Sequence, residues 1–348
     1  MNPLAADLDH ILDNTRDLWE ELRGQRLFIT GGTGFFGCWL LESFLWANDK
    51  LGLNASAVVL TRKPEAFSRK APNLASHSAI RLHVGDVSSF EFPAGQFSHV
   101  IHAATDASAQ LIADDPLRMF DTIVRGTHRT LEFACRCSTR KFLLTSSGAV
   151  YGRQPPEVTH LPEDYQGAPD PAQAQSAYHE GKRAAETLCA IYWKQRGLET
   201  KIARCFAFVG PYLPLEIHFA IGNFIRNGLR GEPIRVKGDG TPYRSYLYAA
   251  DLAIWIWTIL FRAEPCRPYN VGSELALPIA EVARLVAQSF RPSLPVEIHG
   301  RSDAGRPPER YVPATRRAQS ELSLRERIPL SVAIHRTVQW HRTLAAKC

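Results

Sequence analysis

The sequence predicts an α/β fold, in which a doubly wound parallel sheet is joined to a smaller, mixed C-terminal lobe. Short apolar runs alternate with helical stretches from residue 25 to residue 150, as in a parallel sheet covered on both faces. A glycine-rich segment directly follows the first run, and a proline-rich loop after residue 150 marks a change in the order of elements. We therefore divide the chain into a helical extension (1–24), a core (25–175) and remaining core elements interleaved with the lobe (176–348).

The individual elements follow from local patterns. Residues 1–24 place apolar side chains such as Leu8, Leu12 and Trp19 at helical spacing among charges, which predicts one or two amphipathic helices. Apolar runs bounded by turn residues predict the strands, and longer periodic stretches predict the helices. The predicted strands are 26–29, 57–60, 80–84, 98–102, 141–145 and 200–208, and the predicted helices lie near 42–47, 123–137, 176–195, 217–229, 250–262, 278–290 and 331–344.

The glycine-rich segment predicts a Rossmann-type dinucleotide site in the core. Gly31, Gly34 and Gly37 lie between the first strand and the helix that follows it. Backbone N–H groups and the positive end of a helix approach a pyrophosphate only where side chains are absent. A tight strand-to-helix turn alone also needs glycine, so this spacing becomes specific only in its strand-loop-helix context.

Composition narrows the classes of function. The chain has 348 residues, of which 45% are hydrophobic and 22% charged, and a net charge of +6, so a folded globular protein is expected. The basic residues are scattered, which argues against a nucleic-acid partner. We expect a cytoplasmic protein without a membrane segment, because we find no signal-peptide pattern and no apolar run of membrane-spanning length. The seven cysteines lack a metal-ligand spacing, so we expect no metal site.

Tyr178 and Lys182 suggest proton transfer. They lie four residues apart and therefore on one face of a predicted helix. A neighbouring ammonium and the positive charge of a nicotinamide favour the phenolate, which could then exchange a proton with a sugar or alcohol hydroxyl during hydride transfer. A surface Tyr/Lys pair is the alternative that this spacing alone leaves open.

A third motif makes the pattern specific. Ser146 and Ser147 directly follow a predicted strand, within the sequence Thr-Ser-Ser-Gly-Ala-Val-Tyr-Gly (145–152). The glycine loop, the serine-rich strand end and Tyr-x-x-x-Lys, in this order, resemble the extended short-chain dehydrogenase/reductase family over residues 25–322. Within that family, the chain resembles the nucleotide-sugar epimerases, dehydratases, decarboxylases and ketoreductases.

The resemblance implies a role for each matching residue. Tyr178 would be the catalytic acid/base, Lys182 would lower its pKa and bind the nicotinamide ribose, and Ser147 would hydrogen-bond the reacting sugar oxygen. The implied cofactor-binding residues are Gly31, Thr33, Gly34, Phe35, Phe36, Gly37, Arg62, Asp86, Val87, Ala103, Ala104, Tyr178 and Lys182. The implied substrate-binding residues are Ser147, Asn223, Arg244, Arg306 and Arg310.

Departures from the family pattern bear on the reaction. Sugar 4,6-dehydratases place an Asp-Glu pair directly after the catalytic hydroxyl, and sugar-acid decarboxylases usually keep an acid at the second of these positions. This chain has Gly148 and Ala149 there, although residues 178–183 otherwise resemble the decarboxylases. The asparagines expected at Ile123 and Ala207 are also missing. We therefore expect hydride transfer at hexose C4, as in a 4-ketoreductase or a 4-epimerase, with dehydration or decarboxylation as the alternative.

The second strand bears on the cofactor. An NAD enzyme generally presents an acid at its end to the adenosine ribose, whereas this chain has Arg62 and Lys63. Basic side chains attract a 2′-phosphate, so NADP is favoured over NAD. The expected partners are a nucleoside-diphosphate sugar and a second copy of the chain in a homodimer. A non-catalytic dinucleotide-binding scaffold or redox sensor is the alternative from another class, and it would not require Tyr178, Lys182 and Ser147 together.

Overall fold

A computed structural model describes residues 2–105, 113–216, 220–301, 305 and 307–345. It divides the chain into two units. The first comprises residues 1–152, 168–205 and 253–269, and the second comprises 153–167, 206–252 and 270–348.

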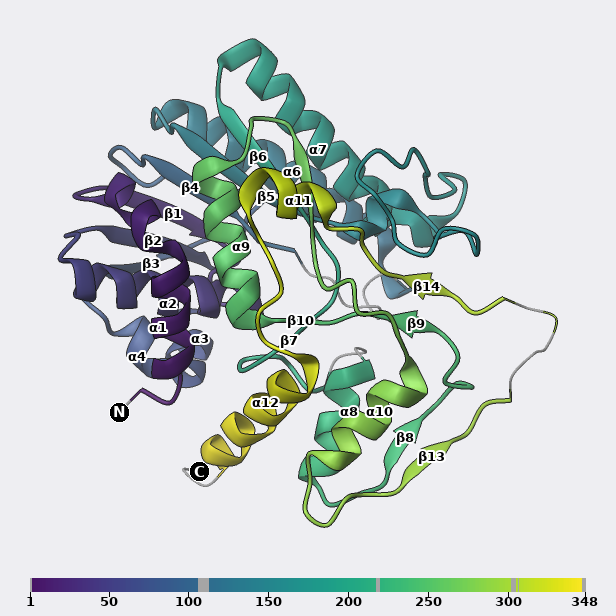
Figure 1. Cartoon of the computed structure of the whole chain (residues 1–348). Coiled ribbons are helices and arrows are strands. Elements are labelled where there is room, and N and C mark those ends of the chain that lie inside the picture. Colours follow the sequence, from purple (N-terminus) through teal and green to yellow (C-terminus); the bar gives the residue numbers. More distant parts are fainter. Residues whose placement is uncertain (1, 106–112, 217–219, 302–304, 306, 346–348) are drawn as a thin grey trace. The chain divides into compact units, whose positions relative to one another are not determined.

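The first unit is built around a seven-stranded sheet with the strand order β11-β6-β5-β4-β1-β2-β3. All neighbouring pairs from β6 to β3 run parallel. Its strands read as apolar runs because both faces are covered, which confirms the predicted doubly wound sheet (Figure 1). The strands are β1 (Arg26–Thr30), β2 (Ser56–Thr61), β3 (Ile80–Val84), β4 (His99–His102), β5 (Lys141–Ser147), β6 (Glu199–Cys205) and β11 (Pro268–Val271).

Helices pack on both faces of this sheet. The long helices α6 (Pro116–Arg136) and α7 (Ala177–Arg196) cover one face and bury a core that includes Phe28, Phe133 and Phe142. On the other face lie α2 (Phe35–Leu51) and α9 (Ala249–Arg262), which are joined by a 2.8 Å hydrogen bond from the Trp257 indole to Ser43 Oγ. The short helices α3 (Pro64–Lys70) and α4 (Pro72–Ala75) connect β2 to β3.

The N-terminal extension is part of the core. It forms α1 (Ala5–Thr15) and the 3₁₀ helix η1 (Arg16–Leu22). The Trp19 ring is fully buried against Trp257, with ring centroids 4.7 Å apart, and its indole N–H donates to Thr15 Oγ1 at 2.9 Å. Glu21 lies where β4 and β5 begin, because its carboxylate contacts His99 Nε2 at 3.1 Å and Lys141 Nζ at 2.8 Å.

The second unit consists of short strands and helices. β7 (Phe208–Val209) pairs with β10 (Leu247–Tyr248), β8 (Ile234–Val236) pairs with β13 (Val296–Ile298), and a third sheet has the order β12-β9-β14. The strands of this third sheet are β12 (Leu277–Pro278), β9 (Tyr243–Arg244) and β14 (Arg310–Tyr311). The helices of the second unit are α8 (Ala220–Leu229), α10 (Ile279–Gln288), α11 (Arg316–Leu322) and α12 (Leu330–Ala345). Two 3₁₀ helices, η2 (Gly148–Tyr151) and η3 (Ala174–Ser176), belong to the first unit.

One predicted strand is interrupted. The sequence predicts a continuous strand over 200–208, but β6 ends at Cys205 and β7 begins at Phe208. β6 pairs with β5 in the large sheet, whereas β7 pairs with β10 in a sheet of its own. The apolar run continues through the break, so hydrophobicity alone does not reveal the change of pairing partner. No helix within the described ranges combines the length and the apolar character needed to cross a membrane.

The Glu21 contacts predict an acid-sensitive stability. Burial raises the pKa of Glu21, but hydrogen bonds from His99 and Lys141 outweigh it and lower this pKa from 4.5 to about 2. Because the folded-state pKa is lowered, the stabilisation is present above 4.5 and is lost as the pH falls towards about 2. Glu21→Gln should lower the free energy of unfolding at neutral pH by about 1–3 kcal/mol.

Urea unfolding at neutral pH and at about pH 3 checks this expectation, since the difference between Glu21→Gln and wild type should shrink in acid. Glu20→Gln is the matched control, because the Glu20 side chain is 71% exposed and pairs only with Arg23 among the described residues. An equal loss of stability in both variants, or a difference that does not depend on pH, would contradict the assignment.

Candidate functional site

The glycine loop lies at the carboxyl end of β1 and packs against the end of β4. Gly31 has φ of +70°, and a Cβ built on it would lie 2.4 Å from the carbonyl carbon of Ala103. A Cβ on Gly37 would lie 2.3 Å from the backbone of Gly32. The segment after β4 is held in place by a 3.2 Å hydrogen bond from Ala104 N to Thr30 Oγ1. Only a chain without side chains at these two positions brings the loop, α2 and β4 this close.

These residues fit a dinucleotide. Gly34 caps the N-terminus of the 17-residue helix α2, and Thr33, Phe35 and Phe36 are partly accessible around it. A helix N-terminus offers backbone N–H groups and a positive dipole end to phosphate oxygens. The predicted pyrophosphate residues, from Gly31 to Gly37 together with Ala103 and Ala104, therefore come together in one place.

The next two strand ends carry the predicted adenosine contacts. Asp86 follows β3, and its carboxylate accepts hydrogen bonds from Ser88 N at 2.9 Å and from Ser88 Oγ at 2.6 Å. Burial raises the pKa of Asp86, but Ser88 and the charges of Arg62 and Arg118 hold it below its usual range. Arg62, which follows β2, is thus close enough to act on the Asp86 charge. Val87 is buried against Gly126 of α6.

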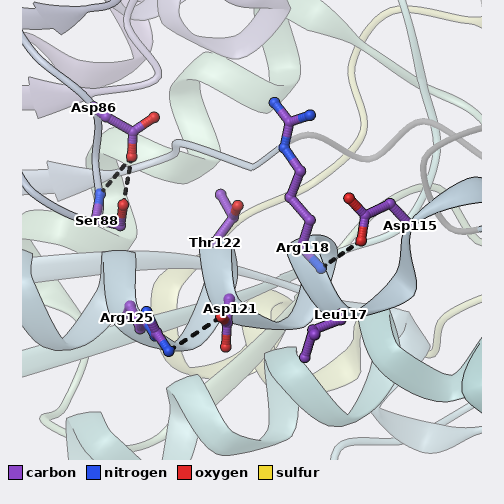
Figure 2. A pocket seen from close by; sticks show the side chains of 8 residues that line it. All are labelled: Asp86, Ser88, Asp115, Leu117, Arg118, Asp121, Thr122 and Arg125. Atoms are coloured by element: carbon purple, nitrogen blue, oxygen red, sulfur yellow. Dashed lines mark hydrogen bonds and ion pairs between the residues drawn. The ribbon is translucent and has the colours of Figure 1, made fainter.

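A cavity of about 470 Å³ opens beside Asp86. Figure 2 shows Asp86 and Ser88 on one side of it and side chains of α6, including Thr122 and Arg118, on another. Its complete lining is Asp86, Ser88, Asp115, Leu117, Arg118, Asp121, Thr122 and Arg125. The cavity therefore continues the predicted adenosine end of the cofactor site.

Ser147, Tyr178 and Lys182 lie together at the carboxyl end of β5. Ser147 is the last residue of β5, and its Oγ accepts a 3.1 Å hydrogen bond from Ala149 N. Tyr178 is in the first turn of α7, where its hydroxyl lies close enough to Ser147 for that side chain to act on its pKa. Lys182 Nζ lies 6.0 Å from the centre of the Tyr178 ring. The three predicted catalytic residues thus form one cluster.

Burial controls the electrostatics of this cluster. It raises the pKa of Tyr178, and the interaction with the Ser147 side chain offsets this only in part. Burial also lowers the pKa of Lys182 to about 8. The sequence-based expectation of a phenolate stabilised by Lys182 is therefore not met by these side chains alone, and the positive charge of a nicotinamide would have to act against the effect of burial.

Two polar residues of this region do not appear among the predicted site residues. Thr105 Oγ1 accepts a hydrogen bond from Lys182 Nζ at 2.8 Å, as does the Thr145 carbonyl oxygen at the same distance. His102 is fully buried between Thr30 Oγ1 at 2.8 Å and Thr127 Oγ1 at 3.1 Å, and burial lowers its pKa to about 3. The signal available in the sequence is their position near the end of a strand, because His102 is the last residue of β4 and Thr105 follows three residues later.

Apart from Ser147, which ends β5 in the first unit, the predicted substrate residues belong to the second unit. Arg244 in β9 lies 3.9 Å from Glu309 and donates to the Tyr243 carbonyl oxygen at 2.8 Å. Arg310 in β14 lies over the Tyr243 ring at 4.1 Å, since β14 pairs with β9. Asn223 is half-buried in α8. Arg306 lies outside the described residues. Over the described ranges, no group of His, Cys, Asp or Glu is placed to hold a metal ion.

The chain is similar to known nucleotide-sugar enzymes. A model of the NAD dependent epimerase/dehydratase family matches residues 27–272. UDP-glucuronic acid decarboxylase 1 of Xenopus tropicalis is 31% identical over 91% of this chain and 72% of its own length. UDP-glucuronic acid decarboxylase 5 of Arabidopsis thaliana is 32% identical over 78% of this chain and 77% of its own length.

Solved structures show the same fold. A dTDP-glucose 4,6-dehydratase from Bacillus anthracis in complex with NAD has a TM-score of 0.74 and 19% identity, covering 92% of this chain and 97% of that one. A UDP-glucose 4-epimerase from Thermotoga maritima with UDP-glucose has a TM-score of 0.76 and 18% identity, covering 92% and 99%. At this identity the likeness supports the fold, and the decarboxylase relatives carry the more specific information.

Tyr178→Phe tests the proton-transfer role. The change removes the hydroxyl and leaves the ring that packs beside Lys182, so turnover should fall by roughly 10²-fold or more. Binding of the dinucleotide, measured by calorimetry, should stay within about threefold of wild type, because the glycine loop is untouched. A folded variant with turnover near wild type would exclude Tyr178 from the proton step.

Proposed function

Because the chain belongs to the NAD dependent epimerase/dehydratase family, we propose that it removes carbon dioxide from a nucleotide-linked uronic acid. The observation that carries this proposal is the similarity, at 30% identity or more, to UDP-glucuronic acid decarboxylases over most of the chain. These relatives favour decarboxylation over the C4 reduction or epimerisation that the sequence predicts first. The Ser147, Tyr178 and Lys182 cluster is compatible with each of these reactions.

A bound nicotinamide dinucleotide would supply a hydride acceptor for C4 of the sugar and later return the hydride. Tyr178 would take the proton from the C4 hydroxyl, while Ser147 orients that oxygen. The resulting 4-keto uronic acid is a β-keto acid. When its C5–C6 bond breaks, the electron pair moves onto the C4 oxygen, and the Ser147 and Tyr178 hydroxyls are placed to donate to the developing negative charge.

This chemistry needs fewer acid/base groups than dehydration. Loss of water requires a base for the C5 proton and an acid for the departing C6 hydroxyl. Carbon dioxide leaves without either group, so a chain with Gly148 and Ala149 after Ser147 is better suited to decarboxylation. Ala149 cannot supply the proton that C5 takes up afterwards, and in this respect the chain departs from the decarboxylase pattern.

Epimerisation at C4 is the second candidate. Ala149 favours it, because an epimerase removes and returns a hydride at one carbon and needs no carboxylate at that position. In either reaction, Arg244 and Arg310 would bind the diphosphate of the nucleotide sugar, since a guanidinium matches phosphate oxygens. Asn223 is proposed to contact the same substrate. The predicted homodimer and cytoplasmic location stay predictions.

The products of the reaction distinguish these proposals. Wild-type protein would be incubated with NAD and with UDP-glucuronate, UDP-glucose or dTDP-glucose, and the products analysed by mass spectrometry. We expect UDP-glucuronate to lose carbon dioxide and no substrate to lose water. An isomer of unchanged mass would favour the epimerase. In a parallel incubation with NADPH and a nucleotide 4-keto sugar, a gain of two hydrogens would favour a reductase. Loss of water would contradict the argument from Ala149.

The choice between NAD and NADP has its own test. Arg62 favours NADP, whereas two dTDP-glucose 4,6-dehydratases with the same fold were solved with NAD. We propose that Arg62 contacts the 2′-phosphate when NADP binds. Arg62→Ala should then weaken NADP binding by about 1.5–3 kcal/mol and leave NAD binding nearly unchanged.

Calorimetric titration of both cofactors decides the matter. Arg81→Ala is the matched control, because Arg81 is also exposed but lies near the beginning of β3, away from the carboxyl ends of the strands. Tighter binding of NAD than NADP by wild type would show that the predicted preference is wrong. It would also agree with a reaction that returns its hydride and does not exchange the cofactor.

A further inference from the structure

A buried ion pair lies next to the catalytic cluster without belonging to it. Arg204 in β6 donates to both carboxylate oxygens of Glu186 in α7, with its shortest contact, Nη2 to Oε2, at 2.7 Å. The two side chains are only 15% and 13% exposed. A buried pair loses much of its attraction to desolvation, and apolar side chains often stabilise such a position equally well. A contribution to stability alone therefore does not explain well why two charged residues occupy these positions.

The remaining contacts of the pair lead to the segment that carries Ser147. Glu186 Oε1 accepts a hydrogen bond from Ser146 Oγ at 2.5 Å, and Ser146 directly precedes Ser147. Arg204 Nη1 donates to the Tyr151 hydroxyl at 2.9 Å. The ion pair thus holds the chain on both sides of Ser147.

The same carboxylate is fixed to the helix of the other two catalytic residues. Glu186 lies one turn after Lys182 and two turns after Tyr178 in α7. Ser147 belongs to β5, so its position relative to Tyr178 depends on the distance between that strand end and this helix. Errors well below 1 Å in such a contact matter for catalysis.

We propose that Glu186 is a positioning residue, which joins the Ser147 strand end to the Tyr178 and Lys182 helix through Ser146 and Arg204. Its charge also acts on Lys182. Burial lowers the pKa of Lys182 to about 8, and the acidic groups of Cys205, Glu186 and Cys189 act in the opposite direction. Within the described part of the chain, the titratable groups that face Lys182 are Tyr178, Glu186 and Cys189 of α7, Cys205 of β6 and His102 of β4.

Glu186→Gln separates this role from simple packing, because it keeps the shape of the side chain and removes its charge. The pKa of Lys182 should fall by roughly one unit, so the alkaline limb of the pH profile should move to lower pH. With NAD and UDP-glucuronate, kcat should fall roughly tenfold to a hundredfold while KM stays within about twofold. Glu180→Gln is the matched control on the same helix, since Glu180 pairs with Arg183 at 3.6 Å.

Ser146→Ala is the second variant, because a buried hydroxyl can be removed with little risk to folding. It cuts the link to the strand end and leaves the ion pair intact. We expect kcat to fall about threefold to tenfold with the pKa of Lys182 unchanged. If Glu186→Gln does not fold, this variant decides the positioning role alone, and a wild-type kcat in Ser146→Ala would overturn it.

The kinetic measurements rest on the proposed function, but the titration of Lys182 does not. The latter uses protein labelled with ¹³C at lysine Cε, with the Lys182 signal assigned by its loss in Lys182→Arg. If wild type is inactive on UDP-glucuronate, the proposed function fails, and the Lys182 titration still tests Glu186. An unchanged Lys182 midpoint in Glu186→Gln, or an equal shift in Glu180→Gln, would overturn the inference.

Discussion

The parallel pairing of the large sheet is the constraint on which the candidate site depends. In parallel strands all carboxyl ends meet at one edge, so residues far apart in sequence are brought together there. Gly31 follows β1, Arg62 follows β2, Asp86 follows β3, Ala103 follows β4 and Ser147 ends β5. Gly31 approaches Ala103 so closely that no side chain fits between them. A side chain there would separate β1 from β4 and displace the loop in which the predicted pyrophosphate contacts lie.

Much of the first unit could be predicted, because its strands are buried on both faces. The predicted strand 80–84 coincides with β3, and the prediction for β5 is only two residues short. The small strands of the second unit were not predicted, since strands of two or three residues, such as β9 and β14, are too short to show a period. Their pairing depends on contacts between distant segments, which local sequence patterns do not encode.

In the candidate site too, contacts between neighbours in sequence could be predicted, whereas contacts between distant segments could not. Tyr178 and Lys182 are one helical turn apart, so their proximity follows from the sequence alone. The pairing of Glu186 with Arg204 crosses from helix to strand, and the contact of Lys182 with Thr105 spans 77 residues. The pKa shifts of Tyr178 and Lys182 could not be predicted from the sequence either, because burial determines whether each pKa is raised or lowered. The charged residues near Lys182 in the sequence predict only the smaller effects on its pKa, which oppose the effect of burial.

The fold and the cluster of Ser147, Tyr178 and Lys182 do not by themselves select a reaction. Epimerases and dehydratases have the same fold as this chain, and fold does not imply function. Decarboxylation, epimerisation and dehydration, as we propose or weigh them for this chain, would each begin by forming a ketone at C4, and the next step would depend on the substituent at C5 and on the groups near it. A C6 hydroxyl leaves only with acid/base help, whereas a C6 carboxylate beside a C4 ketone is already activated by the ketone. With alanine at position 149, the substrate itself must supply more of the chemistry, and the uronic acid that we propose as substrate would supply it. Activity without an acid at this position is therefore more compatible with decarboxylation than with dehydration.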